Sequence, residues 1–131
     1  HFKTSDEAQS TYWLRLMFVH ESGNDLYLGQ AIPRYWLADG QSVGIEKAAS
    51  QFGPLSLRIT SRVGAGEIKA VVQPPERNRP GHIYVRLRHP DAKPIQSVDL
   101  NGQPYGNFDA KKEWIILSGD AQGVQEIMAR Y

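Results

Sequence analysis

Apolar and polar residues alternate along three short stretches of the chain. Side chains at every second position of an extended chain point to the same side, so this period is typical of a half-buried β-strand. The predicted inward side chains are Leu55, Leu57 and Ile59 in residues 55–60, Ile68, Ala70 and Val72 in residues 67–72, and Ile83, Val85 and Leu87 in residues 82–88. The turn sequence VGAG (63–66) separates the first two stretches. They are therefore predicted to form a β-hairpin.

Less regular stretches complete a predicted set of about eight or nine strands. Residues 11–20 carry apolar side chains on both faces, which predicts a strand covered on both sides. The C-terminal stretch contains Gln, Glu, Met and Ala, which favour helix. It is short and flanked by turns, so we predict a strand there too. The principal predicted strands are 11–20, 55–61, 67–72, 82–88, 95–100, 113–117 and 124–131, with shorter ones in 25–30 and 42–50.

Residues 95–117, IQSVDLNGQPYGNFDAKKEWIIL, contain a strand, an Asn-Gly pair, a loop and a second strand. Asn101-Gly102 is the pair most favoured in a type I′ turn, where both central residues need a positive φ. Residues 103–112 are predicted to form a looped excursion. This stretch is therefore expected to turn the sheet near its C-terminal edge.

Short strands with turn signals about every 8–12 residues predict an all-β fold. The predicted architecture is an antiparallel two-sheet β-sandwich of Greek-key, immunoglobulin-like or jelly-roll type. One short helical turn is expected near 33–38, because Pro33 can begin it and Asp39-Gly40 can end it. Residues 1–10 are predicted to be a tail or linker and residues 11–131 a single domain. The proline-rich residues 73–81 are expected to form a loop too polar to pack.

Composition narrows the class of protein. The 15 Lys and Arg residues almost balance the 14 Asp and Glu residues, giving a formal net charge of +1. This balance gives no reason to expect a nucleic acid or a membrane as a partner. The absence of cysteine excludes a disulfide framework and a thiolate zinc site. The chain begins His-Phe-Lys without Met, which is typical of a mature or excised fragment.

Residues with catalytic chemistry are present but not in recognisable motifs. Five carboxylates are available as glycosidase acids, and none sits in a motif: Glu21, Glu46, Asp99, Asp109 and Glu113. The histidines show no metal-binding spacing, and His82 and His89 are expected to flank one strand and face solvent. No dinucleotide or phosphate motif is complete. The sequence therefore predicts no catalytic, cofactor-binding or metal-binding residue.

Aromatic residues offer the best functional candidates. Arg34, Tyr35 and Trp36 lie in a predicted connection and form a possible sugar or interdomain contact. The alternative is that Tyr35 and Trp36 are hydrophobic plugs, because aromatic side chains chiefly fill cores. We favour burial for Trp36 and partial exposure for Tyr35. Trp13 and Trp114 fall in predicted strands and are expected in the core.

Several phrases occur in a familiar order: AIPRYWLADGQSVGIEKAASQFGPLSLRITS, IKAVVQPP and HIYVRLRHPDAKPIQSVDLNGQPYGNFDAKKEWIIL. Over residues 26–131 the chain resembles the C-terminal β-sandwich domain of large, multidomain bacterial glycoside hydrolases of the (α/α)6-barrel, rhamnosidase-like group. The resemblance implies a non-catalytic accessory domain of a polysaccharide-degrading enzyme, packed on the catalytic domain of the same polypeptide. It carries over no catalytic residue and no cofactor. It also favours a periplasmic or extracellular location.

Two other functions remain open at this point. The chain could be an autonomous carbohydrate-binding module, or a structural or adhesion domain of immunoglobulin type. An accessory domain should show a large apolar patch with little charge. A binding module should show a shallow groove with two or three coplanar aromatic rings. Fold alone does not separate these functions, because sandwiches host many of them.

Overall fold

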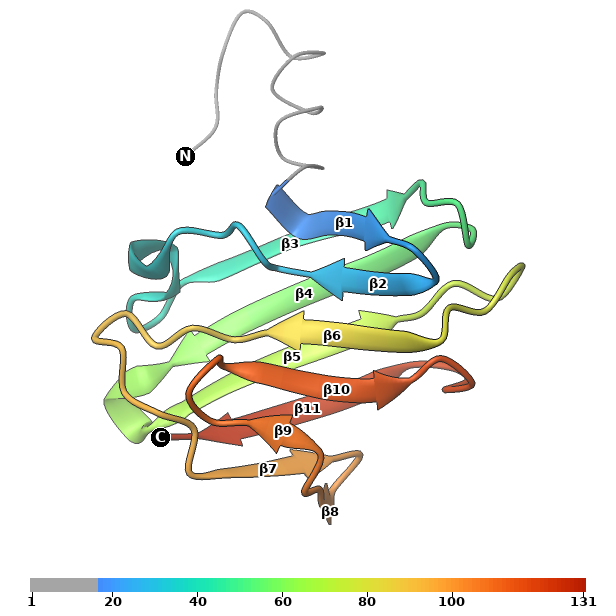
Figure 1. Ribbon diagram of the computed structural model, residues 1–131. Coiled ribbons are helices and arrows are strands. Elements are labelled where there is room, and N and C mark those ends of the chain that lie inside the picture. The colour runs from blue at the N-terminus through green and yellow to red at the C-terminus, as the bar shows by residue number, and fades with distance from the viewer. Residues whose placement is uncertain (1–16) are drawn as a thin grey trace, which may run out of the picture.

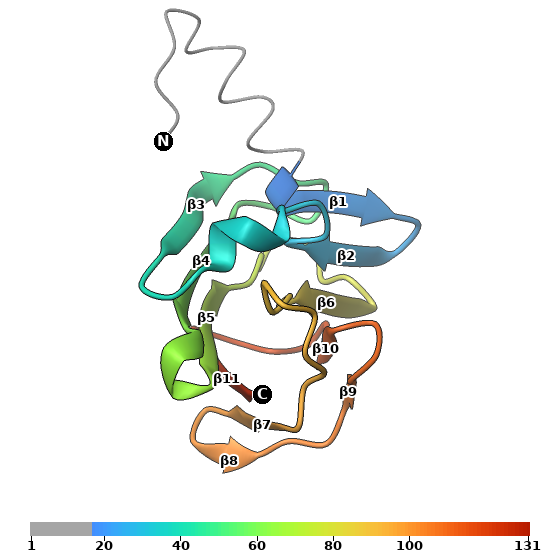
Figure 2. The ribbon, with the colours of Figure 1, turned by 90° about the vertical axis from the view of Figure 1, so that its left-hand side faces the viewer.

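The computed structural model describes residues 17–131, which form two β-sheets packed face to face (Figure 1). The predicted tail and most of the predicted strand 11–20 lie outside these residues. Figure 2 shows the two sheets as separate layers. Within the described residues the only helices besides the turn at Met17–Phe18 are two short 3₁₀ turns, η1 (Arg34–Leu37) and η2 (Val63–Ala65). The prediction of an all-β sandwich with one helical turn near 33–38 is confirmed.

Each sheet is assembled from strands distant in sequence. The five-stranded sheet has the order β1 (Val19–Ser22), β2 (Asp25–Leu28), β6 (His82–Arg86), β10 (Trp114–Ser118) and β9 (Phe108–Asp109). The six-stranded sheet has the order β3 (Ser42–Ala48), β4 (Leu55–Arg62), β5 (Glu67–Gln73), β11 (Gln125–Arg130), β7 (Ser97–Leu100) and β8 (Gln103–Pro104).

One strand pair departs from the antiparallel arrangement. β2 and β6 run parallel, with Tyr27 opposite Tyr84. Parallel neighbours need a long connection. Here the chain makes it by passing through β3, β4 and β5 of the other sheet before it returns (Figure 1).

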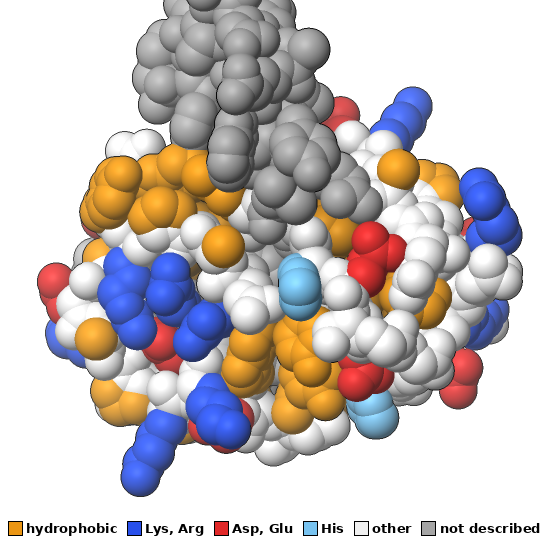
Figure 3. All heavy atoms as spheres, turned by 45° about the horizontal axis from the view of Figure 1, so that its top comes forward, with side chains coloured by type: hydrophobic (Ala, Val, Ile, Leu, Met, Phe, Trp, Pro, Cys, Tyr) orange, Lys and Arg blue, Asp and Glu red, His pale blue; other side chains and the backbone are white. Residues whose placement is uncertain are grey.

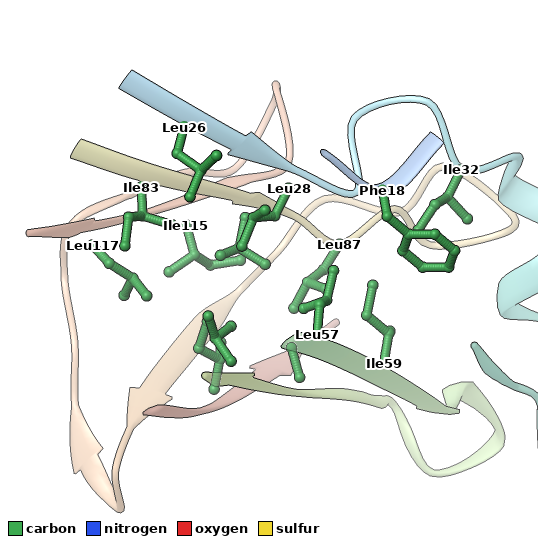
Figure 4. Close-up of a cluster of buried hydrophobic side chains, with 14 of the residues drawn as sticks. Phe18, Leu26, Leu28, Ile32, Leu57, Ile59, Ile83, Leu87, Ile115 and Leu117 are labelled. Atoms are coloured by element: carbon green, nitrogen blue, oxygen red, sulfur yellow. The ribbon is translucent and has the colours of Figure 1, made fainter. Parts of the chain in front are cut away.

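The core lies between the two sheets, where their inward side chains meet (Figure 4). The nine inward residues predicted from the three alternating stretches are all buried, with 2% exposure or less. Their partners come mainly from β2, β10 and β11. In Figure 4, Leu26 and Ile83 approach from the five-stranded sheet, and Leu57 and Ile59 from the six-stranded sheet. The period-two pattern therefore identified the core-facing side of each strand.

The predicted Asn-Gly turn joins β7 to β8 at the edge of the six-stranded sheet. Asn101 and Gly102 have φ values of 53° and 82°, as a type I′ turn requires, and Leu100 pairs with Gln103. The Asn101 side chain accepts a 2.8 Å hydrogen bond from the backbone N–H of Glu126 in β11. From this hairpin the chain crosses to the other sheet and forms β9 and β10.

Two local expectations were wrong. Met17 and Phe18 are helical, so the described part of the first strand begins only at Val19. The loop over residues 73–81 does pack, because Pro74, Pro75 and Pro80 are buried. Proline can be buried in a loop without leaving an unsatisfied backbone N–H, since it has none.

Candidate functional site

The predicted segment Arg34-Tyr35-Trp36 forms most of η1, at one end of the sandwich. Arg34 makes a two-pronged ion pair with Glu113, at 2.6 and 2.8 Å, and also donates to the backbone oxygen of His89 at 2.8 Å. The side chain of Glu113 is 5% exposed and that of Arg34 is 34% exposed. The hydrogen bond to Glu113 raises the pKa of Arg34 above its ordinary value. Arg34 therefore ties η1 to the start of β10.

The next two residues point in different directions. Tyr35 is 73% exposed, more than expected, whereas Trp36 is half-buried and packs against the core. Leu37 is buried, and its carbonyl oxygen accepts a 2.6 Å hydrogen bond from the buried hydroxyl of Ser61. The turn is thus anchored at both ends. It holds the Tyr35 side chain outward on a fixed support.

Polar side chains are buried beneath this turn. His89 is only 3% exposed, which corrects the expectation that it faces solvent. Its Nδ1 accepts a 2.9 Å hydrogen bond from the N–H of Asp91, and its ring lies 5.1 Å from that of Tyr131. Burial lowers the pKa of His89. The Tyr131 hydroxyl donates to the oxygen of Leu87 at 2.6 Å, and burial raises the pKa of that hydroxyl.

The outer side of the five-stranded sheet carries a second aromatic group. Tyr27, Tyr84 and Trp114 come from the neighbouring strands β2, β6 and β10, and we call them the aromatic face. The Tyr27 and Tyr84 rings stack at 4.7 Å with 8° between their planes. The Trp114 ring meets both edge-on, at 5.5 and 5.8 Å.

Trp114 was expected in the core, and this was wrong. Its neighbours Ile115 and Leu117 are buried, which places Trp114 and Ile116 on the outer side of β10. The alternation of EWIIL indicates this outward position, whereas the general preference of tryptophan for cores points inward. Figure 3 shows hydrophobic side chains gathered near the middle of the view with a histidine beside them. His20 and His82 border the aromatic face, 6.0 Å from Tyr27 and 6.1 Å from Tyr84.

The orientation of the rings limits what the aromatic face can bind. A flat sugar platform presents open, coplanar ring faces. Here each tyrosine covers one face of the other, and Trp114 stands steeply inclined to both, so the three rings are not coplanar. The guanidinium carbon of Arg86 also lies 5.0 Å from the centre of the Trp114 ring. This geometry suits packing against another apolar surface better than stacking on a sugar.

The five carboxylates considered from the sequence all have structural contacts. Glu113 pairs with Arg34, Glu46 lies 3.9 Å from Arg58, and Asp99 lies 2.8 Å from Arg130. Glu21 accepts a hydrogen bond from the N–H of Gln51, and Asp109 accepts from those of Lys111 and Lys112. Each of the five carboxylates therefore has a contact within the domain.

Two clefts lie away from the aromatic face. One has a volume of 340 Å³ and is lined by Lys47, Glu76 and Arg77 among other residues. The other, of 210 Å³, contains Asp99 and Glu126, and each of these is ion-paired, to Arg130 and to Lys69. Among residues 17–131, no group of three His, Asp or Glu side chains could hold a metal ion. No helix in this part of the chain is long and apolar enough to cross a membrane.

The chain was compared with protein families, curated proteins and solved structures, and only the solved structures gave matches. No family model and no curated protein matches the chain. A solved structure named "Glycoside hydrolase" resembles it with a TM-score of 0.48 and 12% sequence identity. The matched region covers 81% of this chain and 16% of that protein.

Proposed function

We propose that this chain is a non-catalytic accessory β-sandwich domain of a polysaccharide-degrading glycoside hydrolase. Its aromatic face packs against the catalytic domain of the same polypeptide and stabilises it. The order of sequence phrases in residues 26–131 supports the parent class. The aromatic face, whose rings contact one another instead of forming a coplanar platform, is the single observation that carries the proposed role.

The chemistry of the aromatic face fits a contact between domains. Tyrosine and tryptophan each bury a large area, and together with arginine they dominate the binding energy of protein interfaces. A contiguous group of half-buried aromatic side chains on the outer side of a sheet is unusual for a surface that meets only water. Tyr27, Tyr84, Trp114 and Ile116 form a central apolar group there, and Arg86 lies beside it.

The exposure of Tyr35 favours a second candidate function, that of a carbohydrate-binding module. Its side chain is 73% exposed and stands on an anchored turn. One open aromatic ring can stack on one sugar. A module of this kind would bind a polysaccharide through Tyr35 without a second domain.

The test is association in trans. The chain and the remainder of the polypeptide encoded in the same reading frame are produced separately and mixed, and association is followed by sedimentation velocity. We expect a one-to-one complex and a higher unfolding temperature for the catalytic region, because binding to the folded state stabilises it. We expect no hydrolysis of aryl glycosides by the chain alone. Retention of the chain by a polysaccharide gel, abolished by Tyr35→Ala and without any complex, would favour the binding module instead.

A further inference from the structure

Three arginines gather at the edge of the aromatic face, close to a single buried carboxylate. Arg34, Arg86 and Arg88 come from η1 and from β6 and its extension, and Glu113 precedes β10. Both carboxylate oxygens of Glu113 accept hydrogen bonds from Arg34. Figure 3 shows Lys and Arg side chains clustered around acidic atoms on the left, the side on which η1 lies in Figure 1. Two positive charges at this place are therefore not balanced by a carboxylate.

The contacts of Arg86 and Arg88 confirm that imbalance. Arg86 lies over Trp114 and donates to the backbone oxygen of Gln30 at 3.4 Å. Arg88 donates to the backbone oxygen of Ile32. Within residues 17–131 neither arginine has an ion pair, and the Nε atom of each is buried without a hydrogen-bond partner.

Holding these charges together is unfavourable in the isolated chain. Burial, followed by the nearby guanidinium groups of Arg86 and Arg34, lowers the pKa of Arg88. A carboxylate brought to this place would relieve the repulsion. Guanidinium is also the group best suited to bind a carboxylate in a partly desolvated contact, because its planar N–H groups can donate to both carboxylate oxygens at once.

We propose that Arg86 and Arg88 are the charged part of the interdomain contact, and that they receive Asp or Glu side chains from an acidic surface of the catalytic domain. This inference rests on the proposed function, and it adds the chemistry of the partner surface. A protein partner is favoured over an acidic polysaccharide because the neighbouring rings do not form a coplanar platform for sugar stacking, and Arg86 lies over one face of Trp114. Arginine beside aromatic side chains is the composition of a protein–protein contact centre.

The experiment measures the affinity of the chain for the separately produced catalytic region by titration calorimetry. It compares the wild type, the double variant Arg86→Gln/Arg88→Gln, and the control Arg58→Gln/Lys69→Gln, which removes the same charge from the outer side of the six-stranded sheet. Each protein is measured at about 0.05 M and about 0.3 M salt, between which screening of exposed charges increases strongly. Unfolding midpoints confirm that each variant is folded. Arg86→Gln alone serves as the test if the double variant does not fold.

We expect the wild type and the control to lose affinity by about tenfold or more as salt rises, as charge-steered complexes do. The double variant should bind at least about tenfold more weakly than the wild type at low salt, with a flatter salt dependence. Equal affinity and equal salt dependence for all three proteins would overturn the inference and leave the proposed function standing. Absence of any complex at either salt concentration would refute the proposed function itself. Binding of polygalacturonate to the wild type, lost in the double variant, would instead assign the arginines to an acidic polysaccharide.

Discussion

The two sheets are alike on their inner sides and different on their outer sides. The outer side of the six-stranded sheet carries three exposed ion pairs in a row: Arg58–Glu46, Lys69–Glu126 and Arg130–Asp99. The outer side of the five-stranded sheet carries the aromatic face and a guanidinium group over the Trp114 ring. One side is built to face water. The outer side of the five-stranded sheet carries apolar surface whose contact with water is unfavourable.

The outer sides differ between the two sheets, so they can indicate where a partner would bind, which the shared core pattern cannot. Alternation with apolar residues inward is needed by both sheets, so it carries no information about a partner. Exposed ion pairs contribute little to stability and are common on solvated surfaces. Half-buried aromatic groups on an outer side are not explained by the stability of the sandwich alone. The asymmetry therefore supports the proposal that the five-stranded sheet carries the interdomain contact.

The largest expected effect compares the buried ion pair with an exposed one. Arg34→Ala leaves Glu113 buried without its partner. We expect the free energy of unfolding to fall by about 2–3 kcal/mol. This is less than removing one partner of a fully buried ion pair usually costs, because the Arg34 side chain is 34% exposed. Arg58→Ala, on the other sheet, should cost less than about 0.5 kcal/mol. Urea unfolding with unchanged slopes measures both values, and equal losses would contradict the structural role of Arg34.

A smaller effect is expected within the aromatic face. Tyr84 stacks on Tyr27 and meets the edge of Trp114, so Tyr84→Ala should cost about 1–2 kcal/mol through lost aromatic contacts and burial. Lys69→Ala, at an outward position of β5, should change stability by less than about 0.5 kcal/mol. Chemical denaturation of the isolated chain decides between them. A Tyr84 variant as stable as the Lys69 variant would show that the rings do not hold one another.

The smallest effect is a pH dependence beneath η1. His89 faces Asp91, Lys93, Glu113 and Arg34, and burial is the main cause that lowers its pKa. As the pH falls, His89 is therefore protonated in the unfolded chain before it is protonated in the folded chain. Its contribution to the free energy of unfolding is complete above about pH 6.5 and is lost as the pH falls below that value. His89→Asn can keep an oxygen near the Nδ1 position but does not titrate. Its free energy of unfolding should fall less than that of the wild type between about pH 7.5 and about pH 5. Parallel curves for the two proteins would refute this.

The sequence predicted the inward side of β4, β5 and β6 and the Asn101-Gly102 turn, because both depend on local rules of alternation and backbone conformation. It also singled out Tyr35, which the structure holds outward. It did not predict the aromatic face, because Tyr27, Tyr84 and Trp114 are far apart in sequence and meet only when β2 and β10 pair with the two sides of β6. The ion pair of Arg34 with Glu113 was hidden for the same reason.

The most direct test of the contact surface is hydroxyl-radical footprinting of the chain alone and in complex with the catalytic region. Tyr27, Tyr84 and Trp114 report on the outer side of the five-stranded sheet, and Met128 reports on that of the six-stranded sheet. Complex formation should slow oxidation of Tyr84 and Trp114 severalfold and leave Met128 unchanged. Slower oxidation of Met128, with the rates of Tyr84 and Trp114 unaltered, would place the partner on the opposite side and contradict the account.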